Sequence, residues 1–382
     1  MKKIKVMSIF GTRPEAIKMC PLVKELNKYE EIENLVCVTG QHREMLDQVL
    51  EIFNIKPDYD LNIMKEKQTL TTLTGGVLNE LDEIFKKVQP DIVLVHGDTT
   101  TTFVASLTAF YNKIKVGHVE AGLRTFDKYS PFPEEMNRKL TGALADLHFA
   151  PTNTSKDNLL KEGINEETIF LTGNTVIDAM ENTVISNFQF RNETLKSIDF
   201  DNKKVIMMTA HRRENWDRLD DICTAVATLA NENKDVEIVY LVHLNPIVQD
   251  AAKKHLGNLK NVHLLPPLDM DETHNLMNKS FMIMTDSGGI QEEAPHLGKP
   301  VLVLRDTTER PEAVQAGTVK LAGNTYNEIL KNASELLNDS NLYAKMANSA
   351  NPYGDGEASR RIAENILYFF NKRSKPSDSF GK

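Results

Sequence analysis

The sequence has few cysteines, and none of them has a metal-binding spacing. Its 382 residues include three, Cys20, Cys37 and Cys223, with no CxxC pair and no Cys/His cluster around them. An odd number without such spacing argues against a disulfide framework and against structural zinc. We therefore expect a reducing compartment and no metal site.

Long apolar runs and an excess of positive charge are also missing. The first apolar run ends at Phe10, too early for a secretory signal peptide, and no run approaches the roughly 18 residues of a membrane helix. The 54 acidic residues outnumber the 45 basic ones and give a formal net charge of −9. Such a chain has no general attraction for nucleic acid or an anionic membrane. We expect a cytoplasmic protein that binds neither, in which a local basic or dipolar site holds any anionic ligand.

Four common motifs of nucleotide-binding proteins and hydrolases are absent. The sequence contains no GxGxxG, GxxxxGK[ST], HExxH or GxSxG. Dinucleotide-binding, P-loop, zinc-protease and α/β-hydrolase functions therefore lose support. No cofactor is expected.

Short β-branched runs alternate with helical patterns along most of the chain. This alternation is typical of doubly wound α/β domains with a parallel sheet, and the runs are apolar enough to be buried on both faces. The pattern occurs twice, which predicts two Rossmann-like domains that face a central cleft. The expected strands are 4–10, 35–39, 91–95, 115–119 and 147–150 in the first set, and 204–209, 237–242, 261–265, 281–285 and 300–304 in the second.

The domain boundaries follow from breaks in this pattern. A length of 382 residues favours about two domains, and a polar stretch within 173–203 is the expected hinge. The segment 351–356 is rich in Gly, Pro and Asn and precedes an amphipathic helix. The predicted order is an N-terminal Rossmann-like domain over 1–172, a second Rossmann-like domain over 173–355, a helix over 356–371 that packs back on the first domain, and a disordered tail over 372–382.

Polar residues follow the expected strands of the first domain, at the carboxyl ends where open α/β sheets bind ligands. The turn 11–15 offers free backbone N–H groups, a helix dipole and Arg13 as an anion site, although a plain turn with a solvated arginine has the same sequence. Asp98 and Glu120 follow two further strands, and Asp98 is also a candidate N-cap. Glu134 lies at a helix start, where the dipole alone could account for it. Several converging carboxylates suggest acid/base chemistry on a sugar or similar polyol.

The second domain repeats the arrangement with basic residues. His211 and Arg212 end its first strand, and a histidine there can be structural or catalytic. The turn 287–289, Ser-Gly-Gly, joins a strand to a helix, so its free N–H groups can hold a diphosphate. Glu293 can reach ribose hydroxyls, and Arg310 adds positive charge. Together these features indicate nucleotide-sugar chemistry.

These motifs closely resemble those of the non-hydrolysing UDP-N-acetylglucosamine 2-epimerases, whose fold is the two-domain GT-B fold. The likeness runs from 10–18 to 351–356, almost the whole chain. Its blocks, in the order of that family, are Gly40-Gln41-His42-Arg43, Val95-His96-Gly97-Asp98-Thr99-Thr100-Thr101, Gly117-His118-Val119-Glu120-Ala121-Gly122-Leu123-Arg124, Pro133-Glu134-Glu135-Met136-Asn137-Arg138, His211-Arg212-Arg213-Glu214 and Ser287-Gly288-Gly289-Ile290-Gln291-Glu292-Glu293-Ala294-Pro295.

The resemblance implies a role for individual residues. Three positions depart from many relatives: Glu44 and Lys67 near the regulatory site, and Thr273, where an aromatic residue often lies against the uracil. The implied positions are Asp98, Glu120, Glu134 and His211 for catalysis; Arg13, Lys18, Ser287, Gly288, Gly289, Glu293 and Arg310 for substrate binding; and Gln41, His42, Gln68, Glu134, Arg212 and His243 for a second, allosteric UDP-N-acetylglucosamine.

The implied reaction is reversible epimerisation at C2 of UDP-N-acetylglucosamine, through loss of UDP to 2-acetamidoglucal and re-addition. It fits the residues, because the C2–H is not acidic unless the C1–O bond breaks, and both faces of the ring then need acid/base groups. The resemblance further implies a homodimer that binds UDP-N-acetylglucosamine and UDP and serves cell-surface polysaccharide synthesis. A hydrolysing epimerase, a GT-B glycosyltransferase and a non-catalytic nucleotide-sugar sensor are the alternatives.

Overall fold

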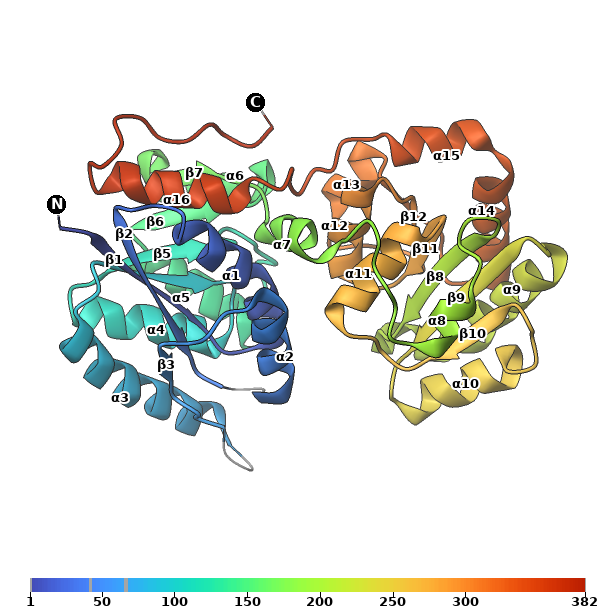
Figure 1. Ribbon diagram of the computed structural model, residues 1–382, viewed down its shortest axis with the longest axis horizontal. Helices are drawn as coiled ribbons and strands as arrows, with labels where there is room; N and C mark the ends of the chain where they lie inside the picture. Colours follow the sequence, from blue (N-terminus) through green and yellow to red (C-terminus); the bar gives the residue numbers. More distant parts are fainter. Residues whose placement is uncertain (1, 41–42, 65–67, 382) are drawn as a thin grey trace. The chain divides into compact units, whose positions relative to one another are not determined.

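The computed structural model describes residues 2–40, 43–64 and 68–381, except the side chains of 43 and 44 (Figure 1). The chain forms two compact units, one of Met1–Asn182 with Tyr353–Lys382 and one of Thr183–Pro352. Each contains one parallel sheet with flanking helices, so the predicted α/β class with two Rossmann-like units is confirmed. The boundaries differ from the predicted ones, because the first unit continues to Asn182 and resumes at Tyr353.

The first unit has a seven-stranded sheet in the order β3-β2-β1-β4-β5-β6-β7. All five expected strands are present, while β3 and β7 are additional. The order reverses between β1 and β4, which is where doubly wound sheets bind ligands at the strands' carboxyl ends. The strands are β1 Ile4–Phe10, β2 Ile32–Val38, β3 Tyr59–Asp60, β4 Ile92–His96, β5 Lys115–Val119, β6 Leu147–Ala150 and β7 Ile169–Leu171. The helices are α1 Arg13–Leu26, α2 Arg43–Phe53, α3 Leu70–Val88, α4 Thr100–Tyr111, α5 Glu134–Leu144, α6 Asn153–Lys161, α7 Thr175–Thr183 and α16 Ala358–Phe369.

The second unit has a six-stranded sheet in the order β10-β9-β8-β11-β12-β13. Again the five expected strands are present and β13 is additional. The strands are β8 Lys204–Ala210, β9 Val236–Val242, β10 Val262–Leu265, β11 Met282–Thr285, β12 Val301–Val303 and β13 Val319–Leu321. The helices are α8 Glu193–Ser197, α9 Leu219–Glu232, α10 Pro246–Leu256, α11 Met270–Lys279, α12 Gly288–Glu293, α13 Pro311–Ala316, α14 Tyr326–Asn338 and α15 Ser340–Ala347.

The cores explain why these strands could be recognised. Side chains of the central strands, such as Met7 and Ile9 in β1 and Ile206 and Met208 in β8, are completely buried. Helices cover both faces of each sheet, so apolar residues are favoured at consecutive positions of a strand. No helix among the described residues is long and apolar enough to cross a membrane.

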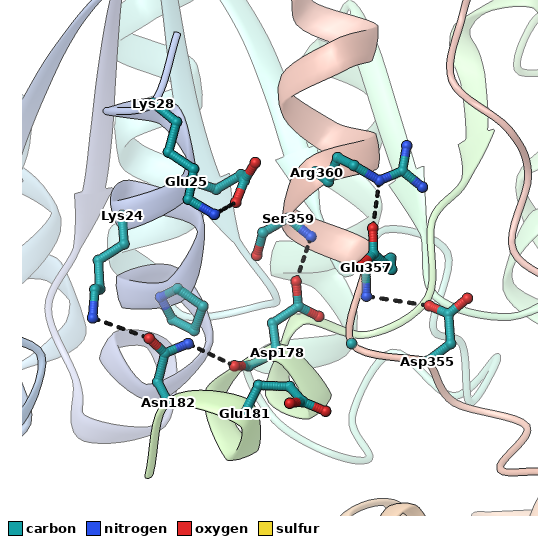
Figure 2. Close-up of a pocket in the computed structure, with 12 residues that line it drawn as sticks. Lys24, Glu25, Lys28, Asp178, Glu181, Asn182, Asp355, Glu357, Ser359 and Arg360 are labelled. Atoms are coloured by element: carbon teal, nitrogen blue, oxygen red, sulfur yellow. Dashed lines mark hydrogen bonds and ion pairs between the residues drawn. The ribbon is translucent and has the colours of Figure 1, made fainter.

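The C-terminal helix α16 packs against α1 of the first unit, as predicted. Asp178 of α7 caps its start, accepting the N–H groups of Ala358 and Ser359 at 3.2 and 2.6 Å. Figure 2 shows the hydrogen bond between Asp178 and Ser359. These two residues line a cavity of about 480 Å³, together with other residues of α1, α7 and the start of α16. None of the expected site residues lines this cavity.

The prediction of a disordered tail is wrong. The N–H of Phe380 donates to the carbonyl of Leu171 in β7 at 2.9 Å, and Asp378 accepts from Arg361 of α16 at 3.1 Å. The polar composition of this segment suggested a solvated chain, but its charged and backbone groups have partners on β7 and α16. The segment therefore belongs to the first unit.

Candidate active site

The turn after β1 is held by a buried glutamate. The Glu15 carboxylate accepts the backbone N–H groups of Gly11 and Thr12 at 3.0 and 2.8 Å, and the hydroxyl of Thr99 at 2.7 Å. Burial raises the pKa of Glu15, and these hydrogen bonds oppose that rise. The expectation of free N–H groups at Gly11 and Thr12 is therefore wrong, because Glu15 already uses them. Arg13, the first residue of α1, is partly buried beside this turn.

Asp98 lies just after β4 and does not cap α4. The N-cap is Thr99, whose hydroxyl accepts the N–H of Thr102 at 3.1 Å. The Asp98 carboxylate instead accepts a hydrogen bond from Arg138 of α5. Burial raises the pKa of Asp98, the charge and hydrogen bond of Arg138 lower it, and the negative charges of Glu120 and Glu134 raise it further. The net pKa of Asp98 lies above its ordinary value.

Glu120 is a second carboxylate of this unit, at the carboxyl end of β5. Its side chain is 9% exposed and forms a close ion pair with Lys18 of α1. It also accepts from Asn174 at 3.0 Å. The backbone of Glu120 has φ 60°, a left-handed conformation that is uncommon outside glycine and that clusters at functional sites. The structure thus brings Glu120 and Lys18 together.

Three histidines of the same unit are buried. Burial lowers the pKa of His96 to about 4, of His118 to about 3 and of His148 to about 4, so all three are neutral near pH 7. Nε2 of His96 lies 3.7 Å from Glu120, and Nε2 of His118 lies 2.7 Å from the carbonyl oxygen of Gly97. The imidazoles of His96 and His118 therefore contact the turns that carry Glu120 and Asp98.

The buried histidines predict a loss of stability in acid. An unfolded histidine takes up a proton near pH 6.5, whereas each of these does so only at a much lower pH. Their contribution is therefore complete above about pH 6.5 and is lost as the pH falls toward 4. In His118→Gln the amide can still donate to Gly97, but it does not titrate. Between pH 7.5 and 5.5, we therefore expect the unfolding free energy of this variant to fall by about 1 kcal/mol less than that of wild type.

Urea unfolding at the two pH values measures this difference. Burial raises the pKa of Asp178 to about 6 and also raises that of Glu15. These two groups therefore add stability as the pH falls, opposite to the effect of the histidines. Both groups remain in the variant, and comparing its pH dependence with that of wild type cancels their effect. An identical loss in the two proteins would show that His118 is not the source.

In the second unit, His211 follows β8 and is oriented by an aspartate. Its Nδ1 lies 3.0 Å from Asp286, which also accepts the backbone N–H groups of His211 and Arg212 at 2.9 and 2.8 Å. Burial alone would raise the pKa of Asp286, but hydrogen bonding and the charge of His211 outweigh it and keep the pKa low. An ionised carboxylate on Nδ1 leaves Nε2 as the imidazole nitrogen for other partners.

The Ser-Gly-Gly turn follows β11 and opens α12, as the sequence predicted. Ser287 is the N-cap of this helix and Gly288 its first residue. A Cβ at Gly288 would lie 2.8 Å from the Glu309 carboxylate, so glycine allows this close approach. Gly289 follows on the same turn.

Acidic residues surround the candidate cations of this unit. Arg310 pairs with Glu292 of α12, and Arg212 pairs with Glu309. Glu293 lies 3.6 Å from Nε2 of His274, a buried residue next to Thr273. Glu292 and Glu309 therefore restrain the side chains of Arg310 and Arg212.

The expected regulatory positions are only partly described. Gln41, His42 and Lys67 lie outside the described residues, as does the side chain of Glu44. The Gln68 amide donates to the carbonyl of Ile63 at 3.0 Å. In the second unit, the rings of His243 and His211 stack with centroids 6.1 Å apart, next to Arg212.

Several residues of these clusters were not singled out in the sequence. Asp286 follows a strand directly, and the rule that identified Asp98 and Glu120 would have identified it too. Arg138 and Asn174 have no such signal, since one lies inside a helix and the other in a connecting segment. Their contacts depend on the tertiary arrangement.

The chain has two doubly wound α/β units, an architecture that defines a protein of the GT-B class. One unit carries the strand-end carboxylates, and the other carries the His211 and Ser-Gly-Gly turns. Residues 24–367 match the sequence model of the family described as "UDP-N-acetylglucosamine 2-epimerase". The chain therefore belongs to the UDP-N-acetylglucosamine 2-epimerase family.

Individual relatives are similar over nearly the whole chain. The UDP-N-acetylglucosamine 2-epimerase of Bacillus subtilis is 59% identical over 100% of this chain and 99% of its own. A solved crystal structure of a UDP-N-acetylglucosamine 2-epimerase is 57% identical over 100% of both chains, with a TM-score of 0.94. The Neisseria meningitidis UDP-GlcNAc 2-epimerase, solved bound to UDP-GlcNAc, is 52% identical over 95% of this chain and 99% of its own, with a TM-score of 0.84.

Proposed function

We propose that this protein, an enzyme of the 2-epimerase family, interconverts UDP-N-acetylglucosamine and UDP-N-acetylmannosamine without net hydrolysis. The observation that carries this proposal is the pair of partly buried carboxylates, Asp98 and Glu120, at adjacent strand ends beside Arg138 and Lys18. Such carboxylates can move a proton at a sugar carbon. The family and the ligand in the Neisseria structure support the choice of substrate.

The proposed reaction begins with elimination. The C1–O bond breaks and its electron pair leaves with the UDP β-phosphate oxygen, while a base removes the C2 proton. The electrons of the C–H bond form the C1=C2 double bond of 2-acetamidoglucal. A proton then reaches C2 from the opposite face as the UDP oxygen adds back to C1, so no water is consumed.

The residues divide between these tasks. Asp98, Glu120, Glu134 and His211 are the proposed acid/base groups, and the ionised Asp286 holds His211 in one tautomer. Departing UDP gains negative charge, which donors that are already in place stabilise without reorganisation. The proposed substrate-binding groups are Arg13, Lys18, Ser287, Gly288, Gly289, Glu293 and Arg310.

Proton NMR of UDP-N-acetylglucosamine with the protein alone tests this function. We expect intact UDP-N-acetylmannosamine to accumulate and, in deuterium oxide, both the product and the substrate that is formed back from it to carry deuterium at C2. The label arises because a solvent-exchanged proton replaces the original hydrogen. Free N-acetylmannosamine with UDP would indicate a hydrolysing enzyme, and an unlabelled product would exclude proton exchange at C2.

The same experiment separates the other functions. A glycosyltransferase needs an acceptor, so without one it would leave the substrate unchanged. A nucleotide-sugar sensor would also leave it unchanged but would bind it. Substrate that stays unchanged under conditions where binding is observed would therefore contradict the proposal.

We further propose that a second UDP-N-acetylglucosamine activates the enzyme. The resemblance supports Gln41, His42, Gln68, Arg212 and His243 as its contacts, together with Glu134. We expect a sigmoidal dependence of rate on UDP-N-acetylglucosamine and poor turnover of UDP-N-acetylmannosamine alone. Initial rates in both directions measure this, and hyperbolic curves in both would contradict it.

We also propose an oligomeric state and a use for the product. The resemblance supports a homodimer, which light scattering can measure. It also supports delivery of the N-acetylmannosamine nucleotide to cell-surface polysaccharide synthesis.

A further inference from the structure

One helix, α5, holds Asp98 from both its side chain and its backbone. Arg138 donates through Nη2 to the Asp98 carboxylate, and Nδ2 of Asn137 donates to the Asp98 carbonyl at 2.9 Å. The two donors are neighbours in sequence. The turn after β4 is thus hydrogen-bonded to α5, a helix that lies further along the chain, after β5.

Arg138 is itself held in place by a buried acid. Its Nη1 donates to Glu135 at 3.1 Å, and its side chain is only 12% exposed. Glu135 also accepts the backbone N–H groups of Thr125 and Phe126, each at 3.0 Å. A continuous set of hydrogen bonds therefore runs from the loop after β5 through Glu135 and Arg138 to Asp98.

The charges around Asp98 make this arginine important. Burial disfavours the ionised carboxylate, and Glu120 at the end of β5 and Glu134 of α5 add negative charge. The guanidinium of Arg138 lowers the pKa of Asp98 and so opposes these effects, while Lys18 of α1 pairs with Glu120. Without Arg138, the pKa of Asp98 would rise further, and the carboxylate would lose the donor that fixes its orientation.

We propose that Arg138, held by Glu135, is a positioning residue that aims the Asp98 carboxylate at the substrate. This inference rests on the proposed acid/base role of Asp98. Arg138 acts through its fork of N–H donors, one directed to each carboxylate, which a lysine cannot reproduce. Misplacing a reacting group by about 1 Å can cost on the order of a hundredfold in rate.

Steady-state kinetics of Arg138→Met and Arg138→Lys over a range of pH test the proposal. We expect kcat to fall roughly 10- to 100-fold in Arg138→Met with a KM within about threefold of wild type, and to fall less in Arg138→Lys. The pH limb that belongs to Asp98 should move to higher pH in Arg138→Met. Lys139→Met is the matched control, because it removes a neighbouring, 42% exposed cation of α5 and should keep the wild-type profile.

A double-mutant cycle separates this inference from the proposed function. If Arg138 acts through Asp98, Arg138→Met should cost little in an Asp98→Asn background. Thermal melting of each variant identifies any that fail to fold, and guanidinium rescue of a folded Arg138→Ala then provides the second readout. A raised KM with unchanged kcat and pH profile, or full additivity with Asp98→Asn, would overturn the positioning role. Normal turnover in Asp98→Asn would instead overturn the proposed function of Asp98.

Discussion

Turnover is expected to fall on the order of a hundredfold or more in each of Asp98→Asn, Glu120→Gln and His211→Asn. These replacements keep nearly the same volume while removing a charge or a titratable group. Asp98 and Glu120 are largely buried beside a cation, so Asp98→Asn removes one ionised partner of Arg138 and Glu120→Gln removes one of Lys18. Substrate binding should suffer less than turnover, because the nucleotide is assigned to other residues.

Rates of epimerisation and affinity for UDP, measured on the same preparations, provide this comparison. Asp235→Asn is a suitable control, since that carboxylate is 61% exposed and lies 3.9 Å from Lys204. It should behave as wild type. Near-normal turnover in all three acid/base variants would exclude elimination through these residues.

Most of the fold could be predicted because its strands are buried on both faces. In strands such as Ile4–Phe10 and Lys115–Val119 all residues but one are buried, and their expected bounds agree with the structure. The strands that were not predicted are short: Tyr59–Asp60, Ile169–Leu171 and Val319–Leu321. Pairing with a neighbouring strand, which a local pattern does not show, decides the state of such segments.

The residues of the candidate site could likewise be predicted only where a local sequence pattern marks them. Asp98, Glu120 and His211 could be identified because the residue that follows a buried strand faces the edge of the sheet where ligands bind. The free N–H groups expected at Gly11 and Thr12 could have been questioned from the sequence, because Thr12 and Glu15 have the spacing of a capping box.

Contacts between distant segments could not be predicted from local patterns. Arg138 and Asp98 are far apart in the chain, and their pairing depends on where α5 crosses the end of β4. Asn174 reaches Glu120 only because the segment after β7 passes beside β5's end. Such pairs determine charge and orientation at the site, so the sequence predicts its members better than its electrostatics.

Affinity for UDP is expected to fall about 10- to 100-fold in Arg310→Gln, the range that loss of a charge-assisted hydrogen bond predicts. Glu292 of α12 pairs with this guanidinium, so Arg310 is held next to the helix that the Ser-Gly-Gly turn opens. Calorimetric titration with UDP measures the effect. Arg218→Gln is the control, because that exposed arginine pairs only loosely with Asp221, at 3.7 Å.

Turnover of Arg310→Gln decides whether the arginine also acts on the leaving group. A donor that binds bound and departing UDP equally well raises affinity without raising kcat, whereas one that binds the departing diphosphate more strongly raises both. Because the β-phosphate oxygen gains charge as the C1–O bond breaks, we expect kcat at saturating substrate to fall as well. Glu293→Gln, proposed to contact ribose, should weaken UDP binding with little change in kcat. An unchanged UDP affinity in Arg310→Gln would remove this residue from the nucleotide site and leave the Ser-Gly-Gly turn as its main proposed contact.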